Sequence, residues 1–533
     1  MSQPAEAPTT LPTPAETPGH LGSDLSADLL TFVAVLLAGS FGTALFFRDI
    51  VPLTLGPFVG LVAALGCRRW LAAGLVGAIS PILIFFGARF ASVPAWKPGL
   101  FWLQGAIETS GIAIVIGIVV FLAIANSERL RPLISALAVF VLVGTMWSSG
   151  LKLATTQSEQ GWVPTQLMTS PVNFNAHMSD EQLYIAYISG VRQGHGYYAT
   201  VLSVLERANE VRGPDGSVNV RSPLSYRMPT LYLLLSALPY NGGVFVMVML
   251  AACTFGVVCA YLLGRQFVTN ALALAGAAFV ASVFSGLASP SMLDAESWTG
   301  IFGLAAVLFM VLSYRRQSRA WGLQLAAVGF AVLGALFREL GVAFLLLGLA
   351  AALADRRDVG RRYWIAWVGG LIVTFGALAA HWSIAAAAYR GAPASGPDRF
   401  SWFHPDALGL VSAMHLLAAH AWFAPAVAWL LLALGMVGSA LAPRDLPTRI
   451  ALMGVCLGGP LVLLVLRPPG WSTYGVPGYW GDLIAPTILA CAPLAAVWLA
   501  AARDGVASPT PRFDVPQPAT PAEAPRPPSA PAP

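Results

Sequence analysis

Charged side chains are scarce in this chain: Asp, Glu, Lys and Arg make up only 10% of its 533 residues, whereas an ordinary soluble domain has about 25%. Hydrophobic residues make up 57%, and a water-soluble chain of this length needs far more polar surface to cover its core. The composition therefore excludes a soluble enzyme, a nucleic-acid binder and a disordered scaffold as interpretations of the whole chain. It predicts a polytopic membrane protein.

Lysine and cysteine are also scarce. Lys97 and Lys152 are the only lysines, so nearly all of the basic charge behind the net charge of +5 is arginine. In a membrane protein such arginines report topology rather than nucleic-acid binding. The five cysteines lie in or beside apolar stretches without metal-ligand spacing, which favours small buried side chains over a disulfide framework or a zinc site. The richness in Arg, Ala, Gly and Pro is typical of a GC-rich bacterial genome.

Several catalytic and nucleotide-binding motifs are missing. The chain contains no GxxxxGK[ST], no GxGxxG after a strand, no HExxH and no GxSxG. These absences argue against a nucleotide-driven pump and against the common hydrolases. No half-to-half repeat is visible, which weakens the interpretation as a secondary transporter.

Long apolar runs are what the sequence does contain. Residues 1–25 and 505–533 are Pro/Ala/Thr-rich tails that we predict to be disordered. About fourteen runs between them are long enough to cross a bilayer, so the predicted fold is an all-α polytopic transmembrane helical bundle. The predicted spans lie near 28–47, 50–67, 70–90, 104–126, 132–150, 242–264, 267–287, 298–314, 321–337, 340–354, 363–384, 422–442, 448–466 and 481–502.

The predicted organisation has two transmembrane parts. Residues 26–131 form an N-terminal four-span extension, and residues 132–504 form the main module with a large extracytoplasmic loop at 151–227. Fifteen arginines fall on the connections assigned to the cytoplasm, against seven basic residues on the short outer connections. This bias predicts a multi-pass protein of a bacterial cytoplasmic membrane with both termini in the cytoplasm.

The long outer loop carries the first candidate for chemistry. From Asp180 the pattern predicts a short amphipathic helix with Tyr184 and Tyr187 on one face, broken near residues 194–196. A carboxylate here lies near the lipid headgroups, where a lipid-linked substrate presents its head. Such a carboxylate can act as a general base on an acceptor hydroxyl. The alternative is a helix N-cap and a solvated acidic pair.

A second acidic pair stands at the outer mouth of the predicted span 298–314. Asp294 or Glu296 could bind a sugar hydroxyl, help to position the base, or coordinate a divalent cation together with Asp180. The alternative is a helix N-terminus, which favours acidic residues without any further role.

Basic and aromatic residues fall on the same predicted face. Arg227 ends the long loop, Arg338 is followed by Glu339 at an outer turn, and Arg467 and Tyr474 belong to a late outer loop. Arginine is the preferred bidentate partner of phosphate, and tyrosine can stack on a sugar or an isoprenoid. The alternatives are anchoring at the membrane interface and an ion pair without function. Polar residues that a membrane chain keeps on one face are candidates for one shared site.

The order of these motifs resembles the integral-membrane glycosyltransferases of the GT-C superfamily, in particular the bacterial branch related to protein O-mannosyltransferases and aminoarabinose transferases. The likeness covers about 135–500. Its motifs are Asp180-Glu181, Gly194-His195-Gly196-Tyr197, the run PTLYLLL from Pro229 to Leu235, and Asp294 in a second outer loop. The chain departs from the pattern in two places: about four extra spans precede the acidic pair, and Thr230 replaces a second proline.

The resemblance implies an enzyme that moves a sugar from a polyprenyl-phosphate carrier to a glycan, lipid or protein acceptor on the extracytoplasmic face. Asp180, with Glu181 beside it, would be the catalytic base. The transition state would be oxocarbenium-like, with the phosphate charge held by arginine. The substrate-binding residues would be Tyr184, His195, Arg227, Asp294, Glu296, Arg338, Glu339, Arg467 and Tyr474. The resemblance implies a reaction that needs no nucleotide, and it leaves open whether a divalent cation takes part.

Two other functions are compatible with the same composition. A lipid or polysaccharide transporter or flippase would need ionisable residues near the middle of the membrane, where the sequence has few. A non-catalytic membrane subunit would leave Asp180, Asp294 and Arg338 far apart.

Overall fold

The computed structural model describes most of the chain from residue 180 onward. The described residues are parts of 136–147, then 180–210, 227–238, 242–268, 270–287, 293–315, 320–355, 360–388, 425–441, 445–465 and 478–503. By its internal contacts the chain divides into two compact units, Met1–Ser148 and Ser149–Pro533. The helices α7 to α20 all belong to the second unit. The predicted boundary between residues 131 and 132 stays a prediction.

All regular structure in the described part is helical, without strands, as the sequence predicts. Three helices are long and apolar enough to cross a membrane, and they indicate a membrane protein: Val244–Gly264, Ala295–Arg315 and Arg362–Ala388. Shorter apolar helices cover Leu272–Phe284, Trp321–Phe337, Glu339–Ala354, Trp429–Ala440, Leu446–Val462 and Ala485–Ala495. The total of about fourteen spans stays a prediction, because the first four predicted spans and both tails lie outside the described residues.

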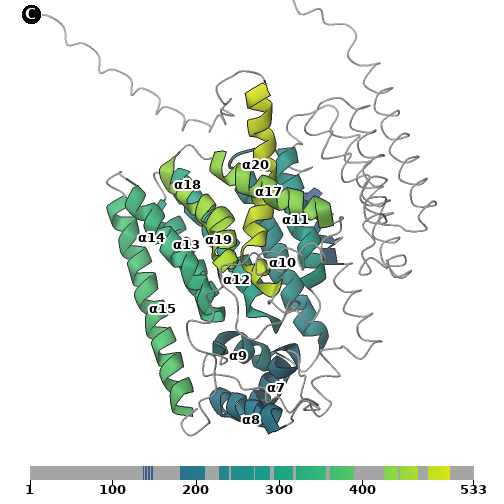
Figure 1. Cartoon of the computed structure of the whole chain (residues 1–533), viewed down its shortest axis with the longest axis vertical. Helices are drawn as coiled ribbons and strands as arrows, with labels where there is room; N and C mark the ends of the chain where they lie inside the picture. Colours follow the sequence, from purple (N-terminus) through teal and green to yellow (C-terminus); the bar gives the residue numbers. More distant parts are fainter. Residues whose placement is uncertain are drawn as a thin grey trace, which may run out of the picture. The chain divides into compact units, whose positions relative to one another are not determined.

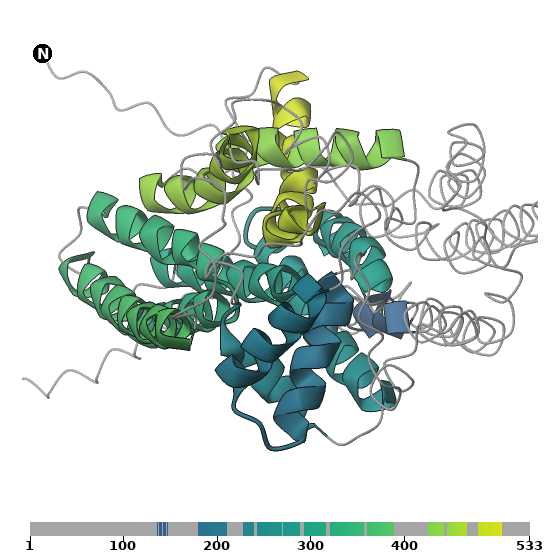
Figure 2. The same ribbon diagram turned by 60° about the horizontal axis from the view of Figure 1, so that its bottom comes forward.

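Three short helices lie together at one end of the long helices (Figure 1; Figure 2 views them from that end). They are α7 (Asp180–Arg192), α8 (Tyr197–Glu210) and α9 (Pro229–Ala237), and α7 packs on both of the others. The helix predicted from Asp180 is confirmed. Its predicted break is confirmed as well: α7 ends at Arg192, and Gly194 then takes a positive φ of 89°, a conformation that favours glycine. Pro229 begins α9, where the missing N–H of proline costs nothing.

The remaining helices and helical turns follow in chain order. They are α10 (Gly242–Gly264), α11 (Asn270–Leu287), α12 (Ala295–Arg315), α13 (Ala320–Phe337), η5 (Glu339–Gly341), α14 (Val342–Ala354), α15 (Gly360–Ala388), α17 (Pro425–Leu441), α18 (Leu446–Met453), the π-helical turn η7 (Gly454–Gly458), α19 (Gly459–Val465), η8 (Gly478–Leu483) and α20 (Ala485–Arg503). Helix α12 is the centre of this part of the fold: it packs on α10, α13, α18, α20 and η8, and almost all of its side chains are buried.

The short helices are joined to the long ones through direct contacts. Helix α9 packs on α13, and α8 packs on α15, where the Tyr198 hydroxyl lies 2.9 Å from His381 Nδ1. These contacts bring the segment predicted as an outer loop next to the ends of the long helices that carry Glu296 and Arg338.

Candidate functional site

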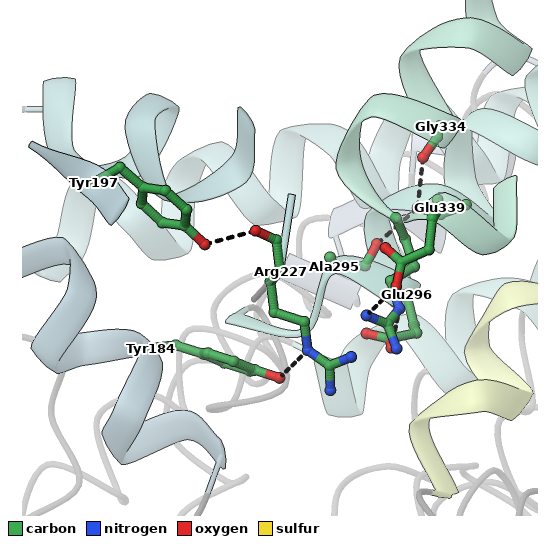
Figure 3. A network of polar contacts seen from close by, with 9 residues as sticks. Tyr184, Tyr197, Arg227, Ala295, Glu296, Gly334 and Glu339 are labelled. Carbon is green, nitrogen blue, oxygen red and sulfur yellow. Dashed lines mark hydrogen bonds and ion pairs between the residues drawn. The ribbon is translucent and has the colours of Figure 1, made fainter. Parts of the chain in front are cut away.

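A buried cluster of charged side chains lies where α12 begins and α13 ends. Arg338 Nε is 2.7 Å from Glu296 Oε1, and Arg338 Nη1 donates to Glu339 Oε1 at 3.0 Å (Figure 3). The side chains of Arg338 and Glu296 are 5% and 2% exposed, whereas that of Glu339 is 28% exposed. One guanidinium therefore bridges two carboxylates that come from different helices.

The local backbone explains why these residues meet. Arg338 follows the last residue of α13 in an extended conformation, and Glu339 begins the short turn η5. Glu296 is the second residue of α12, where the positive end of the helix dipole favours an acidic side chain. The Thr299 hydroxyl shares its hydrogen between the carbonyls of Ala295 and Gly334, at 2.9 and 3.0 Å, and so ties the start of α12 to α13.

A second arginine reaches the cluster from the segment before α9. Arg227 Nε donates to the hydroxyl of Tyr184 at 3.1 Å, and the carbonyl of Arg227 accepts from the Tyr197 hydroxyl at 2.7 Å (Figure 3). Arg227 is half-buried and close enough to Arg338 to lower the pKa of that guanidinium. The two arginines thus lie near one another, on segments more than one hundred residues apart in the chain.

Four tyrosines pack against one another beside Arg227. Tyr184, Tyr187, Tyr197 and Tyr232 are all buried, and the rings of Tyr197 and Tyr232 stack with centroids 6.0 Å apart. Burial raises the pKa of Tyr232 well above its ordinary value, and the neighbouring tyrosines and Glu296 raise it further. The phenol of Tyr232 is therefore neutral, and the contacts among the four rings join α7, α8 and α9 into one aromatic layer beside the charged cluster.

The guanidinium of Arg338 stays ionised although its side chain is buried. Burial and the nearby Arg227 lower the pKa of Arg338, but Glu296 and Glu339 outweigh them and the pKa is raised above its ordinary value. A buried ion pair of this kind contributes little to net stability compared with an apolar replacement. A buried cluster of ionisable groups with a shifted pKa is therefore a candidate for a functional site.

A third carboxyl approaches the same helix end from η8. The Ser297 hydroxyl donates to Asp482 Oδ2 at 2.9 Å, between two residues that are 0% and 2% exposed. This hydrogen bond joins η8 to the first turn of α12, next to Glu296.

The structure brings together five of the residues that the sequence singled out: Tyr184, Arg227, Glu296, Arg338 and Glu339. Asp294 is also buried, immediately before α12. By contrast, His195 is exposed in the turn between α7 and α8 and takes no part in this network.

The predicted catalytic residues begin α7. Asp180 and Glu181 are its first two residues, but their side chains lie outside the described part, as do Arg467 and Tyr474 entirely. Position 180 lies one helical turn from Tyr184 on the same face, about 6 Å away along the axis. The role of Asp180 as the base therefore stays a prediction, for a residue that lies one helical turn from Tyr184.

Sequence reasoning did not select Ser297 and Asp482 as site residues. A signal for Asp482 was available, because it is an isolated carboxyl at the start of a predicted span, and such residues are costly unless they have a role. Ser297 carried no such signal, because a serine after two acidic residues is ordinary at a helix start.

The described residues include no group of three or more His, Cys, Asp or Glu that could hold a metal ion. The cation predicted at Asp180 and Asp294 stays a prediction, because it depends on the side chain of Asp180. Comparison of the whole chain with known protein families, curated proteins and solved structures finds no match.

Proposed function

We propose that this chain is a membrane glycosyltransferase of the GT-C type, which moves a sugar from a polyprenyl-phosphate carrier to an acceptor on the extracytoplasmic face of a bacterial cytoplasmic membrane. The observation that carries the proposal is the convergence of Arg227 and Arg338 with Glu296 and Glu339, next to the helix that Asp180 begins. The motifs that resemble the superfamily, at 180–181, 194–197 and 229–235, fall on α7, the turn after it, and α9.

The proposed reaction transfers one glycosyl group. Asp180 takes the proton of an acceptor hydroxyl, the acceptor oxygen attacks the anomeric carbon, and the bond from that carbon to the phosphate oxygen breaks. The polyprenyl phosphate leaves with the electron pair of that bond, so negative charge develops on the phosphate. Arg227 carries its charge on a half-buried side chain beside the cluster and would stabilise the leaving phosphate.

The remaining groups have supporting roles in this proposal. Arg338 is held by two carboxylates, whose two formal negative charges balance its single positive charge, and its direction is set by them. Tyr184 fixes the guanidinium of Arg227 through its hydroxyl. Glu339 is the most exposed of the three partners in the ion pairs and is the best placed to accept hydrogen bonds from sugar hydroxyls.

The test is the variant Asp180→Asn in membranes that carry a radiolabelled polyprenyl-phosphate sugar pool. Loss of a general base lowers the rate of glycan transfer by about 100-fold or more. The matched control is Glu206→Gln, which removes an exposed carboxylate from α8 and is expected to leave transfer unchanged. Transfer by Asp180→Asn at the wild-type rate would refute the proposed base, and labelled lipid that crosses the membrane without forming product would favour a flippase.

A further inference from the structure

The short helix η8 makes an unusually close backbone contact with the first turns of α12. A Cβ atom built on Gly300 would lie 2.0 Å from the carbonyl oxygen of Asp482 and 3.3 Å from Leu483 Cα. No side chain fits in that space, so this position of α12 needs glycine if η8 is to lie where it does. The contact joins two segments that are about 180 residues apart in the chain.

One hydrogen bond accompanies the backbone contact. Ser297 is three residues before Gly300 and lies on the same face of α12, and its hydroxyl donates to Asp482 Oδ2 at 2.9 Å. Both side chains are almost completely removed from solvent. The other carboxyl oxygen, Oδ1, is buried and meets no hydrogen-bond donor among the described residues. Ser297 is thus the hydrogen-bond partner that the described structure shows for this carboxyl.

The turn held by η8 is the one that presents Glu296. Glu296 directly precedes Ser297, and its carboxylate contacts Arg338 at 2.7 Å. Thr299 holds the same turn on its other side, through the carbonyl of Gly334. The start of α12 is therefore fixed between η8 and α13, and Glu296 projects from this fixed turn toward Arg338. A shift of this turn would move Glu296 relative to the buried guanidinium of Arg338.

We propose that Asp482 is a positioning residue of the candidate site. Through Ser297 it fixes the first turn of α12, keeps Glu296 engaged with Arg338, and so sets the direction of the positive charge at the site. This inference rests on the proposed sugar transfer and deepens it, because it assigns a role to a residue outside the motifs that resemble the superfamily. Asp482 acts through Ser297 and Glu296 and does not itself contact the reacting atoms.

The test compares variants at the two ends of the hydrogen bond. Ser297→Ala and Asp482→Leu each remove this hydrogen bond. Both are expected to lower kcat for sugar transfer by about tenfold or more, because a small displacement of a charged group slows the reaction. The KM for the lipid donor is expected to change by less than about threefold, because the groups that bind the donor are intact. Asp482→Asn keeps an oxygen that accepts from Ser297, and its kcat is expected to stay within about threefold of wild type.

A matched control lies on the same helix. Ser313 is buried near the other end of α12, where its hydroxyl contacts Gln324. Ser313→Ala also removes a buried serine hydroxyl from α12 and is expected to leave kcat unchanged. Equal losses in Ser313→Ala and Ser297→Ala would mean that the effect is general to α12, and would overturn the positioning role.

A second measurement separates the two levels of the proposal. Hydrogen exchange of the purified protein is expected to be faster in a peptide covering Ala295–Phe302 in Ser297→Ala, and unchanged there in Ser313→Ala and Asp482→Asn. If wild type transfers sugar but Ser297→Ala keeps both its kcat and its exchange rates, the positioning role is wrong. If wild type transfers no sugar, the proposed function is wrong, and the positioning role in that reaction is wrong with it.

Discussion

Helices α12 and α15 look alike in sequence and differ in the structure. Both are long enough to cross a membrane, and their most apolar windows have the same mean hydropathy. Yet 83% of that window is buried inside the protein in α12, and only 22% in α15. Helix α15 exposes a series of large apolar side chains: Trp364, Ile365, Ile372, Val373, Phe375, Trp382 and Ile384.

The comparison shows what hydropathy measures. A lipid tail and a protein interior are equally apolar, so the same composition suits a helix surrounded by lipid and one surrounded by other helices. Buried polar residues occur in both helices: α12 buries Glu296 and Ser297 at its first turn, and α15 buries Thr374 and His381. The glycine contacts differ, because Gly300 of α12 meets the backbone of η8, whereas Gly370 of α15 meets the side chains of Val328 and Leu345.

The largest expected effect comes from breaking the buried ion pair. Arg338→Gln leaves the carboxylate of Glu296 without its cation and is expected to destabilise the protein by about 3–5 kcal/mol. Arg362→Gln, on the exposed side of α15, is expected to change stability by less than about 0.5 kcal/mol. The measurement is thermal unfolding of both purified variants in detergent. The double variant Glu296→Gln/Arg338→Gln is expected to recover part of the loss, and a wild-type Tm for Arg338→Gln would contradict the ion pair.

A smaller effect is expected from adding one methyl group to α12. Gly300→Ala places a Cβ against the backbone of Asp482 and is expected to cost about 1–3 kcal/mol, seen as a lower Tm. Gly369→Ala is the matched change in α15, where a Cβ meets nothing within 4 Å. It is expected to be neutral or slightly stabilising, because alanine favours a helix over glycine. Equal Tm values for the two variants would show that the contact of η8 with α12 is not tight.

Local sequence patterns predicted α7 and its end, but they did not predict α8. Helical spacing from Asp180 predicts α7, and the glycines around His195 predict its end; Pro229, at the first position of α9, fits the preference of proline for helix starts. These features depend on backbone preferences of a few neighbouring residues, which the sequence states directly. Tyr184 is buried for the same reason, because helical periodicity places it on the inner face of α7.

The site could be predicted only in part. Residues such as Glu296 and Arg338 stand out because an ionisable group in an apolar chain is costly, so each is a candidate wherever it occurs. Which carboxylate pairs with which arginine depends on the packing of α12 against α13, and the sequence contains no measure of that distance. The role of Ser297 depends on η8, which arrives from nearly two hundred residues later in the chain.

Composition and periodicity were sufficient to identify an all-helical membrane protein, since both follow from how apolar side chains and helical backbones behave in a bilayer. Packing was needed to separate α12 from α15, and to join Arg338, Glu296 and Asp482 at the end of one helix. The physical reason is that hydropathy is a property of each residue, whereas burial and ion pairing are properties of neighbours that meet only when distant helices come together.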